Sequence, residues 1–260
     1  MRKTLFVVIL LCCAPFYLLA QAVKAKREYY QITIYHFKDE AQKLEIDSYL
    51  EKALLPALHR MKINNVGVFT PIANDTVTDK KVVVIMPATS LQEILDLSGK
   101  LFKDESFRLD GKKFIEAAYD SPPFTRMEKL LLYAFPKAPV LNLPGLNGPK
   151  SERIYEFRSY ESPTEKLFIN KVQMFNEGGE VALFKRLNFN AVFYAGVIAG
   201  GSMPNLIYMT SFENMADRDA HWKTFSADPE WKKLSGDPAY QHNVSKADII
   251  LMKAASFSDY

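Results

Sequence analysis

The side chains best suited to chemistry in this sequence are four histidines, His36, His59, His221 and His242. A zinc site needs several nitrogen or sulfur ligands, and two histidines four residues apart on a helix are a common part of one. No two of these histidines have that spacing, so the sequence predicts no metal site. His36, at the end of a predicted strand, and His59, late on a predicted helix, remain candidates for the mouth of a pocket.

A second candidate site is an aromatic group around His221. Trp222 is its neighbour, and Phe225 follows Trp222 by three residues, which places both rings on one face of a helix. The group could line a ligand pocket. The alternative is core packing, because aromatic rings at helical spacing bury a large apolar area. The segment 228–231 next to it has a complete structural explanation as a helix start, with Asp228 as N-cap and a proline in the first turn.

A third candidate is a charged pair on one predicted strand. Glu156 and Arg158 are two residues apart, so their side chains share a face of the strand. One hypothesis is that Arg158, with Glu156 and Tyr194, binds a polar or anionic ligand between the sheets. The alternative is a structural ion pair at the interface between two modules.

Signatures of other reaction classes are missing from the sequence. It contains no G-x-S-x-G nucleophile motif, no phosphate-binding loop and no dinucleotide fingerprint. Ser202 follows two glycines, but it lies in a predicted hairpin loop and not in a nucleophile motif. We therefore expect no cofactor, and the catalytic residues, if there are any, are unknown.

The elements that must position these side chains occur twice. Four segments of the first half match four of the second in the same order and at nearly the same spacing. The matching pairs are 30–35 with 155–160, 60–64 with 186–190, 84–86 with 208–210, and 102–107 with 225–231. Prolines and glycines are concentrated between the halves, which is typical of a linker. We expect modules at 23–136 and 151–260, joined by a linker at 137–150.

Each half has the pattern of a βαββαβ unit. Alternating apolar residues predict strands near 28–36, 65–71, 81–86 and 128–135 in the first half, and near 153–160, 190–198, 206–211 and 247–253 in the second. This order is the ferredoxin-like α+β unit, an antiparallel sheet with helices on one face. Two such units can pack sheet to sheet and build a barrel-like body. Duplication supplies both partners within one chain, as a pseudo-dimer.

Helix ends are also marked in the sequence. We expect Ser90 and Asn214 to cap the second helix of each module, and Ser162, followed by a proline and then Glu165, to cap the first helix of module two. The first helix of module one is expected to turn an apolar stripe that includes Leu44 toward the core. Breaks are predicted at Pro56 and at the glycine pair 178–179.

Two segments of the second half resemble the NIPSNAP family. They are Tyr-Glu-Phe-Arg-Ser-Tyr at 155–160 and His-Trp-Lys-Thr-Phe-Ser-Ala-Asp-Pro-Glu-Trp at 221–231. The first half departs from this pattern, with no tryptophan and a degenerate Asp-Glu-Ser-Phe at 104–107. The resemblance implies a dimeric α/β-barrel fold with a cleft between sheet and helices in each module. Relatives in that superfamily include oxygenases, haem-degrading enzymes and small-molecule binders. NIPSNAP proteins have no agreed catalytic residues.

The first residues are typical of an export signal. Arg2 and Lys3 precede an uncharged, largely apolar run, and Ala20-Gln21-Ala22 provides the small residues that a signal peptidase recognises. We expect cleavage after Ala22, no stable membrane anchor afterwards, and a periplasmic or secreted protein. Both cysteines lie in this segment, so the mature chain would have no thiol.

The charge of the mature chain excludes one class of partner. Without Arg2 and Lys3, 31 basic residues face 30 acidic ones, which gives no reason to expect binding to nucleic acid. We expect an exported protein that binds a small molecule or a protein partner, and that could also associate with copies of itself. The alternative is a cofactor-independent oxygenase or isomerase acting in a barrel cleft. A third hypothesis, haem handling, depends on His59 or His221 projecting into a cavity.

Overall fold

The structure, a computed structural model, describes residues 26–260, so the predicted signal segment lies outside the described residues. The first module runs in the order β1 (Tyr29–Phe37), α1 (Glu40–Tyr49), a π-helical turn (Leu50–Leu54), α2 (Leu55–Arg60), β2 (Gly67–Pro71), a 3-10 turn (Ile72–Asp75), β3 (Lys80–Ala88), α3 (Leu91–Leu101), α4 (Glu105–Asp110), α5 (Lys112–Ile115) and β4 (Arg126–Ala134). This is the predicted βαββαβ order.

The second module repeats that order after the linker. Its elements are β5 (Ile154–Glu161), α6 (Glu165–Asn176), α7 (Glu180–Arg186), β6 (Phe193–Ala199), β7 (Asn205–Phe212), α8 (Met215–Ala227), α9 (Pro229–Ser235), a 3-10 turn (Pro238–Tyr240) and β8 (Lys246–Ala254). The two modules also share an ion pair in the same place. Arg60 binds Asp104 in the first, and Arg186 binds Asp228 in the second, at 2.8 and 2.9 Å.

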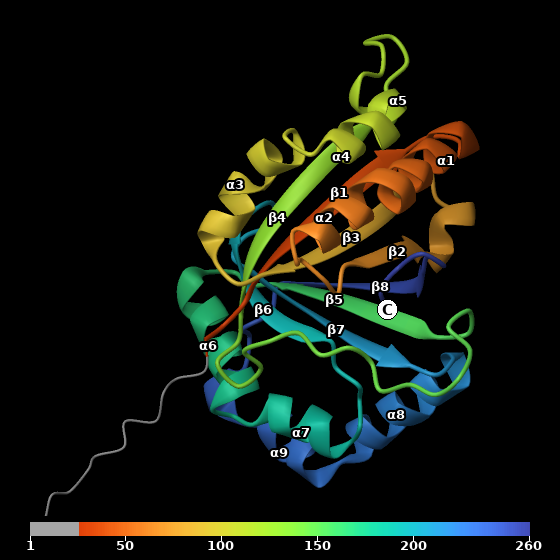
Figure 1. The fold of residues 1–260 in the computed structure, drawn as a ribbon. Coiled ribbons are helices and arrows are strands. Elements are labelled where there is room, and N and C mark those ends of the chain that lie inside the picture. Colours follow the sequence, from red (N-terminus) through yellow and green to blue (C-terminus); the bar gives the residue numbers. More distant parts are fainter. Residues whose placement is uncertain (1–25) are drawn as a thin grey trace, which may run out of the picture.

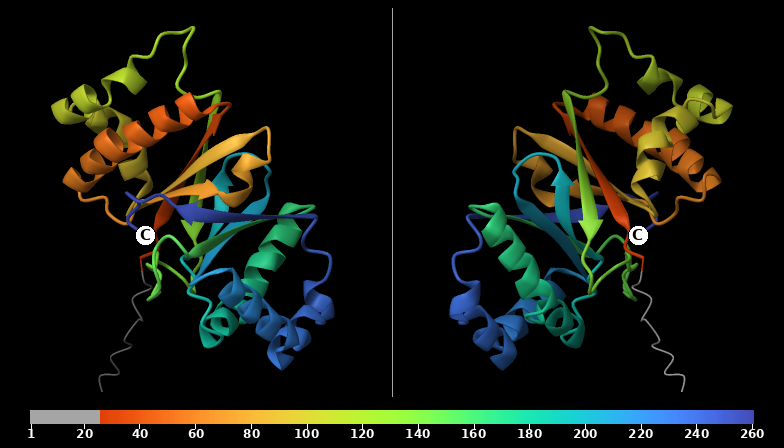
Figure 2. Two further views of the ribbon diagram at one scale, coloured as in Figure 1. Left: turned by 90° about the vertical axis from the view of Figure 1, so that its right-hand side faces the viewer. Right: turned by 90° about the vertical axis from the view of Figure 1, so that its left-hand side faces the viewer.

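The eight strands close into one antiparallel barrel in the order β1-β3-β2-β8-β5-β7-β6-β4. Two seams join the modules, between β2 and β8 and between β4 and β6. The expected pairing of the two modules within one chain is therefore confirmed. Figure 1 shows the helices of the first module on one side of the barrel and those of the second on the other, and both views in Figure 2 show the same layering.

Apolar side chains form three cores in these layers. Inward-facing residues of all eight strands fill the barrel, among them Tyr30, Phe69, Tyr155 and Phe193. The outer face of each sheet packs against its own helices and forms a separate core. Alternate residues of one strand therefore serve different cores, as the two faces of a pleated strand require. No helix among residues 26–260 is long and apolar enough to cross a bilayer.

Most predicted helix ends are confirmed. The side chains of Ser90 and Asn214 accept hydrogen bonds from the third residue beyond them, as N-caps do. One prediction was wrong, because Thr164 rather than Ser162 caps α6. The hydroxyl of Ser162 is buried and donates to the backbone carbonyl of Asn243 at 2.7 Å. The prediction for Leu44 was also wrong, since 62% of this residue is exposed.

Both predicted helix breaks are present. Pro56 lacks a backbone donor, and it lies in the first turn of α2, directly after the π-helical turn. In the second module Gly179 separates α6 from α7 with φ of +91°, a left-handed conformation that glycine adopts without strain.

The linker is held against the second module. The carboxylate of Glu213, which follows β7, accepts hydrogen bonds from the backbone amides of Asn147 and Gly148 at 2.8 and 2.7 Å. These bonds lower the pKa of Glu213. Arg153 also donates to the carbonyls of Leu146 and Gly148, so two charged side chains anchor this part of the linker.

Candidate functional site

A cavity of about 450 Å³ lies between the sheet and the helices of the first module. Its floor is the outer face of β1, β3 and β4, and its walls come from α3, α4, α5 and the loop between α5 and β4. Most of the lining is apolar, including Leu58, Val84, Met86, Leu101, Phe114 and Phe124. We call it the module-one cleft.

Aromatic rings shape one wall of this cleft. The rings of Tyr49 and Phe114 stack with centroids 4.0 Å apart and 6° between their planes. Tyr35 meets Phe114 edge-on at 6.0 Å and lies 5.8 Å from Phe124. Burial raises the pKa of Tyr35 and of Tyr49, so both phenols stay protonated near neutral pH and can donate hydrogen bonds.

Neutral polar groups of β1 and α3 lie among the apolar residues that line the cleft. The amide of Gln31 donates to the hydroxyl of Thr33 at 3.4 Å, and both side chains point from β1 toward the helices. Ser98, on α3, borders the opposite side. These polar groups are short, and they leave the space above the sheet open.

The second module places charged or larger side chains at the same positions. Glu156 and Arg158 on β5 correspond to Gln31 and Thr33 on β1 in strand register. Trp222 lies eight residues after the N-cap of α8, as Ser98 lies eight residues after the N-cap of α3. Gln31, Thr33 and Ser98 of the module-one cleft therefore each correspond to a charged or aromatic residue in module two.

These counterparts form one buried network. Glu156 is fully buried and receives hydrogen bonds from Arg158 at 2.6 Å, from Arg218 at 2.6 Å and from the indole nitrogen of Trp222 at 2.8 Å. The guanidinium of Arg158 also lies over the Trp222 ring, 3.7 Å from its centroid, and donates to the hydroxyl of Tyr160 at 2.8 Å. The predicted Glu156–Arg158 ion pair is confirmed. Its predicted place was wrong, because it lies between sheet and helices of module two and not between the modules.

A second buried pair extends this network. Lys171 on α6 binds Glu180 on α7 at 3.1 Å, and both are almost completely buried. Burial raises the pKa of Glu180, and the nearby ammonium of Lys171 opposes that rise. With Trp222 above Arg158, the side chains fill the space that is open in module one. None of them lines the larger cavities found among residues 26–260.

The other predicted site residues of module two are packed against neighbouring side chains. No larger cavity within the described part of the chain opens around His221. The Nδ1 atom of His221 lies 2.9 Å from the carbonyl of Asp217, and its ring packs against Phe189. Phe225 is buried and stacks on a ring of α7. Tyr194 does not contact Arg158 through its hydroxyl. It stacks on Tyr208 and borders a separate hollow of about 490 Å³ beside the linker.

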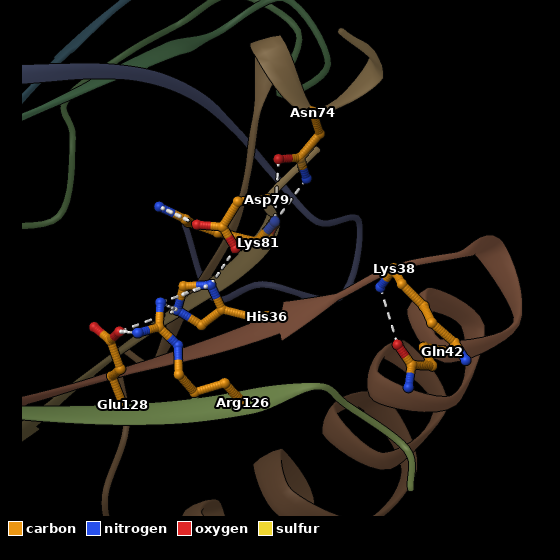
Figure 3. Close-up of polar contacts among 8 residues, drawn as sticks. All are labelled: His36, Lys38, Gln42, Asn74, Asp79, Lys81, Arg126 and Glu128. Carbon is orange, nitrogen blue, oxygen red and sulfur yellow. Dashed lines mark hydrogen bonds and ion pairs between the residues drawn. The ribbon is translucent and has the colours of Figure 1, made fainter. Parts of the chain in front are cut away.

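His36 lies on the opposite face of β1 from the cleft. Figure 3 shows it among charged groups at the ends of β1, β3 and β4. Its ring nitrogens lie 2.6 Å from Asp79 and 3.4 Å from Glu128, and Arg126 bridges to Glu128 at 2.8 Å. Burial alone would raise the pKa of Asp79, but hydrogen bonds from His36 and Lys81 lower it overall. The arrangement ties three strand ends together.

His59 links α2 to Asp259, near the end of the chain. Its Nε2 atom lies 3.0 Å from the carboxylate of Asp259, which also accepts the backbone amide of Val66. Neither His59 nor His221 lines the cleft, so the haem hypothesis lacks the projecting histidine that it requires. Among residues 26–260 no group of three or more potential ligands is arranged to hold a metal ion.

The sequence reasoning missed the cleft residues Gln31, Thr33, Ser98 and Tyr49. For Gln31, Thr33 and Ser98 the signal is the comparison of the two repeats, which places Glu156, Arg158 and Trp222 at the matching positions.

Comparison with known proteins agrees with this architecture. The NIPSNAP family model matches residues 155–259. The second module is a NIPSNAP domain. The first module lies outside that match, in keeping with its divergence at the cleft. A search among curated proteins found no match.

Solved structures share the tandem fold. A protein from Lactobacillus acidophilus described as a "putative monooxygenase" has a TM-score of 0.57 at 10% identity, covering 88% of this chain and 94% of that chain. An anthrone oxidase-like protein has a TM-score of 0.54 at 8% identity, covering 89% and 93%. A NIPSNAP-like domain protein from Burkholderia xenovorans has a TM-score of 0.38 at 19% identity and covers 42% of this chain and 90% of its own. At these identities the first two neighbours establish the fold alone.

Proposed function

We propose that this protein is an exported binding protein that holds a largely apolar small molecule in the module-one cleft. The observation that supports it is the cleft itself, open in module one and filled by side chains in module two. Its volume of about 450 Å³ lies in the usual range for ligand pockets, about 300 to 1,000 Å³. Apolar walls with a few polar groups are also typical of such sites.

The composition of the lining favours binding over turnover. The side chains that border the cleft among the described residues include no histidine, cysteine, aspartate or glutamate. Histidine and the carboxylates are the usual general acids and bases, although lysine and tyrosine can also serve. The titratable groups of this lining are Lys129 and three tyrosines, and within the described residues the lining holds no histidine or carboxylate to pair with them.

Export is the second part of the proposal. It rests on the basic start, the apolar run and the Ala20-Gln21-Ala22 site, which together have the pattern of a cleaved signal peptide. A cleaved chain would begin at Val23.

Native mass spectrometry of the protein, purified gently from its exporting host, tests both parts. A mass matching a chain that begins at Val23, plus a small-molecule increment, is the expected result. A full-length chain that stays inside the cell would overturn the export proposal, and an uncleaved chain in the exported fraction would overturn cleavage after Ala22.

Substitution of Ser98 locates the ligand. Ser98→Trp places in module one the side chain that covers the network in module two, and it is expected to remove the increment. The matched control is Lys100→Trp, on the same helix but outside the cleft lining. A retained increment in Ser98→Trp would overturn the cleft proposal. A wild-type chain that carries no small-molecule increment would favour a role in binding a protein partner through the outer surface.

The oxygenase alternative has one specific support, the phenols of Tyr35 and Tyr49 at the cleft wall, which could donate to a substrate oxygen. One structural neighbour is described as anthrone oxidase-like, so oxygen uptake with anthrone as substrate is a direct assay. Uptake that is abolished by Ser98→Trp would favour the enzyme over the binding protein. No uptake above that of the buffer would exclude this substrate.

A further inference from the structure

Lys129 is the one charged side chain among the described residues that line the module-one cleft. It lies on β4 directly opposite Thr33 of β1. Side chains on a strand alternate between faces, so Lys129 and Met127 face the cleft while Arg126 and Glu128 face the barrel side. Arg126 and Glu128 bind each other at 2.8 Å. Lys129 has no ion-pair partner within residues 26–260.

In module two, a cation at this part of the fold is paired with a carboxylate of the same module. There the cation is Arg158, whose neighbour on the adjacent strand is the uncharged Ile249. Its counter-ion is the carboxylate of Glu156, which is placed over the sheet and fully buried. The equivalent of Glu156 in module one is Gln31, which is neutral. Module one therefore has an exposed cation beside the cleft, at the position of Ile249, and no carboxylate at the position of Glu156.

We propose that the missing carboxylate is supplied by the ligand, which is an amphiphile with an apolar body and one anionic headgroup. This inference rests on the proposed binding function of the cleft. The headgroup lies near Lys129, with Thr33 and Gln31 as further hydrogen-bond donors. The apolar body lies along the rings of Tyr49 and Phe114.

A pair of dyes with the same ring system tests the charge directly. N-phenyl-1-naphthylamine is neutral, and 1-anilinonaphthalene-8-sulfonate carries one negative charge. Lys129 is exposed, so the ion pair is screened by solvent and is expected to change affinity by up to about fivefold, which corresponds to about 1 kcal/mol. Lys129→Met is therefore expected to weaken binding of the sulfonate about threefold to fivefold and to leave the neutral dye unchanged.

The matched control is Lys103→Met, which removes the same charge from an exposed position outside the cleft lining. It is expected to affect neither dye. Decanoate is likewise expected to displace the neutral dye more strongly than decanol from the wild type, and to lose that advantage in Lys129→Met.

The outcomes separate this inference from the function on which it rests. If Ser98→Trp abolishes binding of both dyes while Lys129→Met leaves their affinity ratio unchanged, the cleft binds ligands but the anionic headgroup is wrong. If Ser98→Trp affects neither dye, both proposals fail.

Discussion

Glu156 is the residue whose replacement tests the buried network most directly. Glu156→Gln keeps the size of the side chain and removes its charge. It leaves Arg158 without the carboxylate that it binds, whereas Arg218 keeps its contact with the exposed Asp219. The amide nitrogen of the new side chain would also face the donors that now bind a carboxylate oxygen.

The expected loss in the free energy of unfolding is about 3 kcal/mol. Breaking a buried ion pair by removing one partner costs about 3 to 5 kcal/mol. We use the lower end of this range because the side chains of Arg158 and Arg218 are 13% and 20% exposed. Water can therefore partly replace the lost contact. A second argument gives a similar value. Glu156 accepts three hydrogen bonds, and each loses about 1 kcal/mol when a carboxylate becomes neutral.

Urea unfolding followed by tryptophan fluorescence measures this loss, because both tryptophans, Trp222 and Trp231, lie in module two. The matched control is Glu161→Gln, the same change on the same strand. Glu161 pairs with Lys246 at 3.4 Å, and the lysine side chain is 57% exposed, so this pair is expected to contribute about 0.5 kcal/mol. A loss for Glu156→Gln as small as that for Glu161→Gln would refute the argument from burial.

Two further perturbations test the helix break and the linker. Gly179→Ala is expected to cost about 1 kcal/mol, because φ is +91°, whereas Gly99→Ala, in open space within α3, is expected to stabilise by about 0.5 to 1 kcal/mol. Urea midpoints of the two variants should therefore move in opposite directions. The bonds from Asn147 and Gly148 lower the pKa of Glu213, so they are present above its ordinary value near 4.5 and are lost as pH falls through the lowered one. Hydrogen-exchange protection of both amides is expected to drop on acidification and to become insensitive to pH in Glu213→Gln; equal sensitivity in both proteins would contradict this.

The fold was predictable because its signals are local and occur twice. Alternating apolar residues placed all eight strands to within a few positions, since a half-buried strand needs that alternation. The cap of α6 was not predictable in the same way. Ser162 and Thr164 are both good caps in sequence, and the choice depends on the bond from Ser162 to Asn243, a contact 81 positions away.

The sequence did not point to the module-one cleft for a similar reason. Charged and aromatic residues such as Arg158 and Trp222 are conspicuous in a sequence, and in module two they do meet. A cleft, however, is formed where side chains are small, and Thr33 or Ser98 carries no signal of its own. Whether space remains above a sheet depends on the volumes of side chains from several distant segments, which only the packed structure shows.

The fusion of two modules into one barrel has a consequence for how such a protein can evolve. In a symmetric homodimer every substitution is made twice, once in each subunit, so both sites change together. Joined in one chain, the halves are free to change one at a time. One half can retain a rigid, closed interior that maintains the barrel, while the other half explores new ligands. A mutation that lowers stability in the half that changes is then tolerated, because the other half still stabilises the barrel.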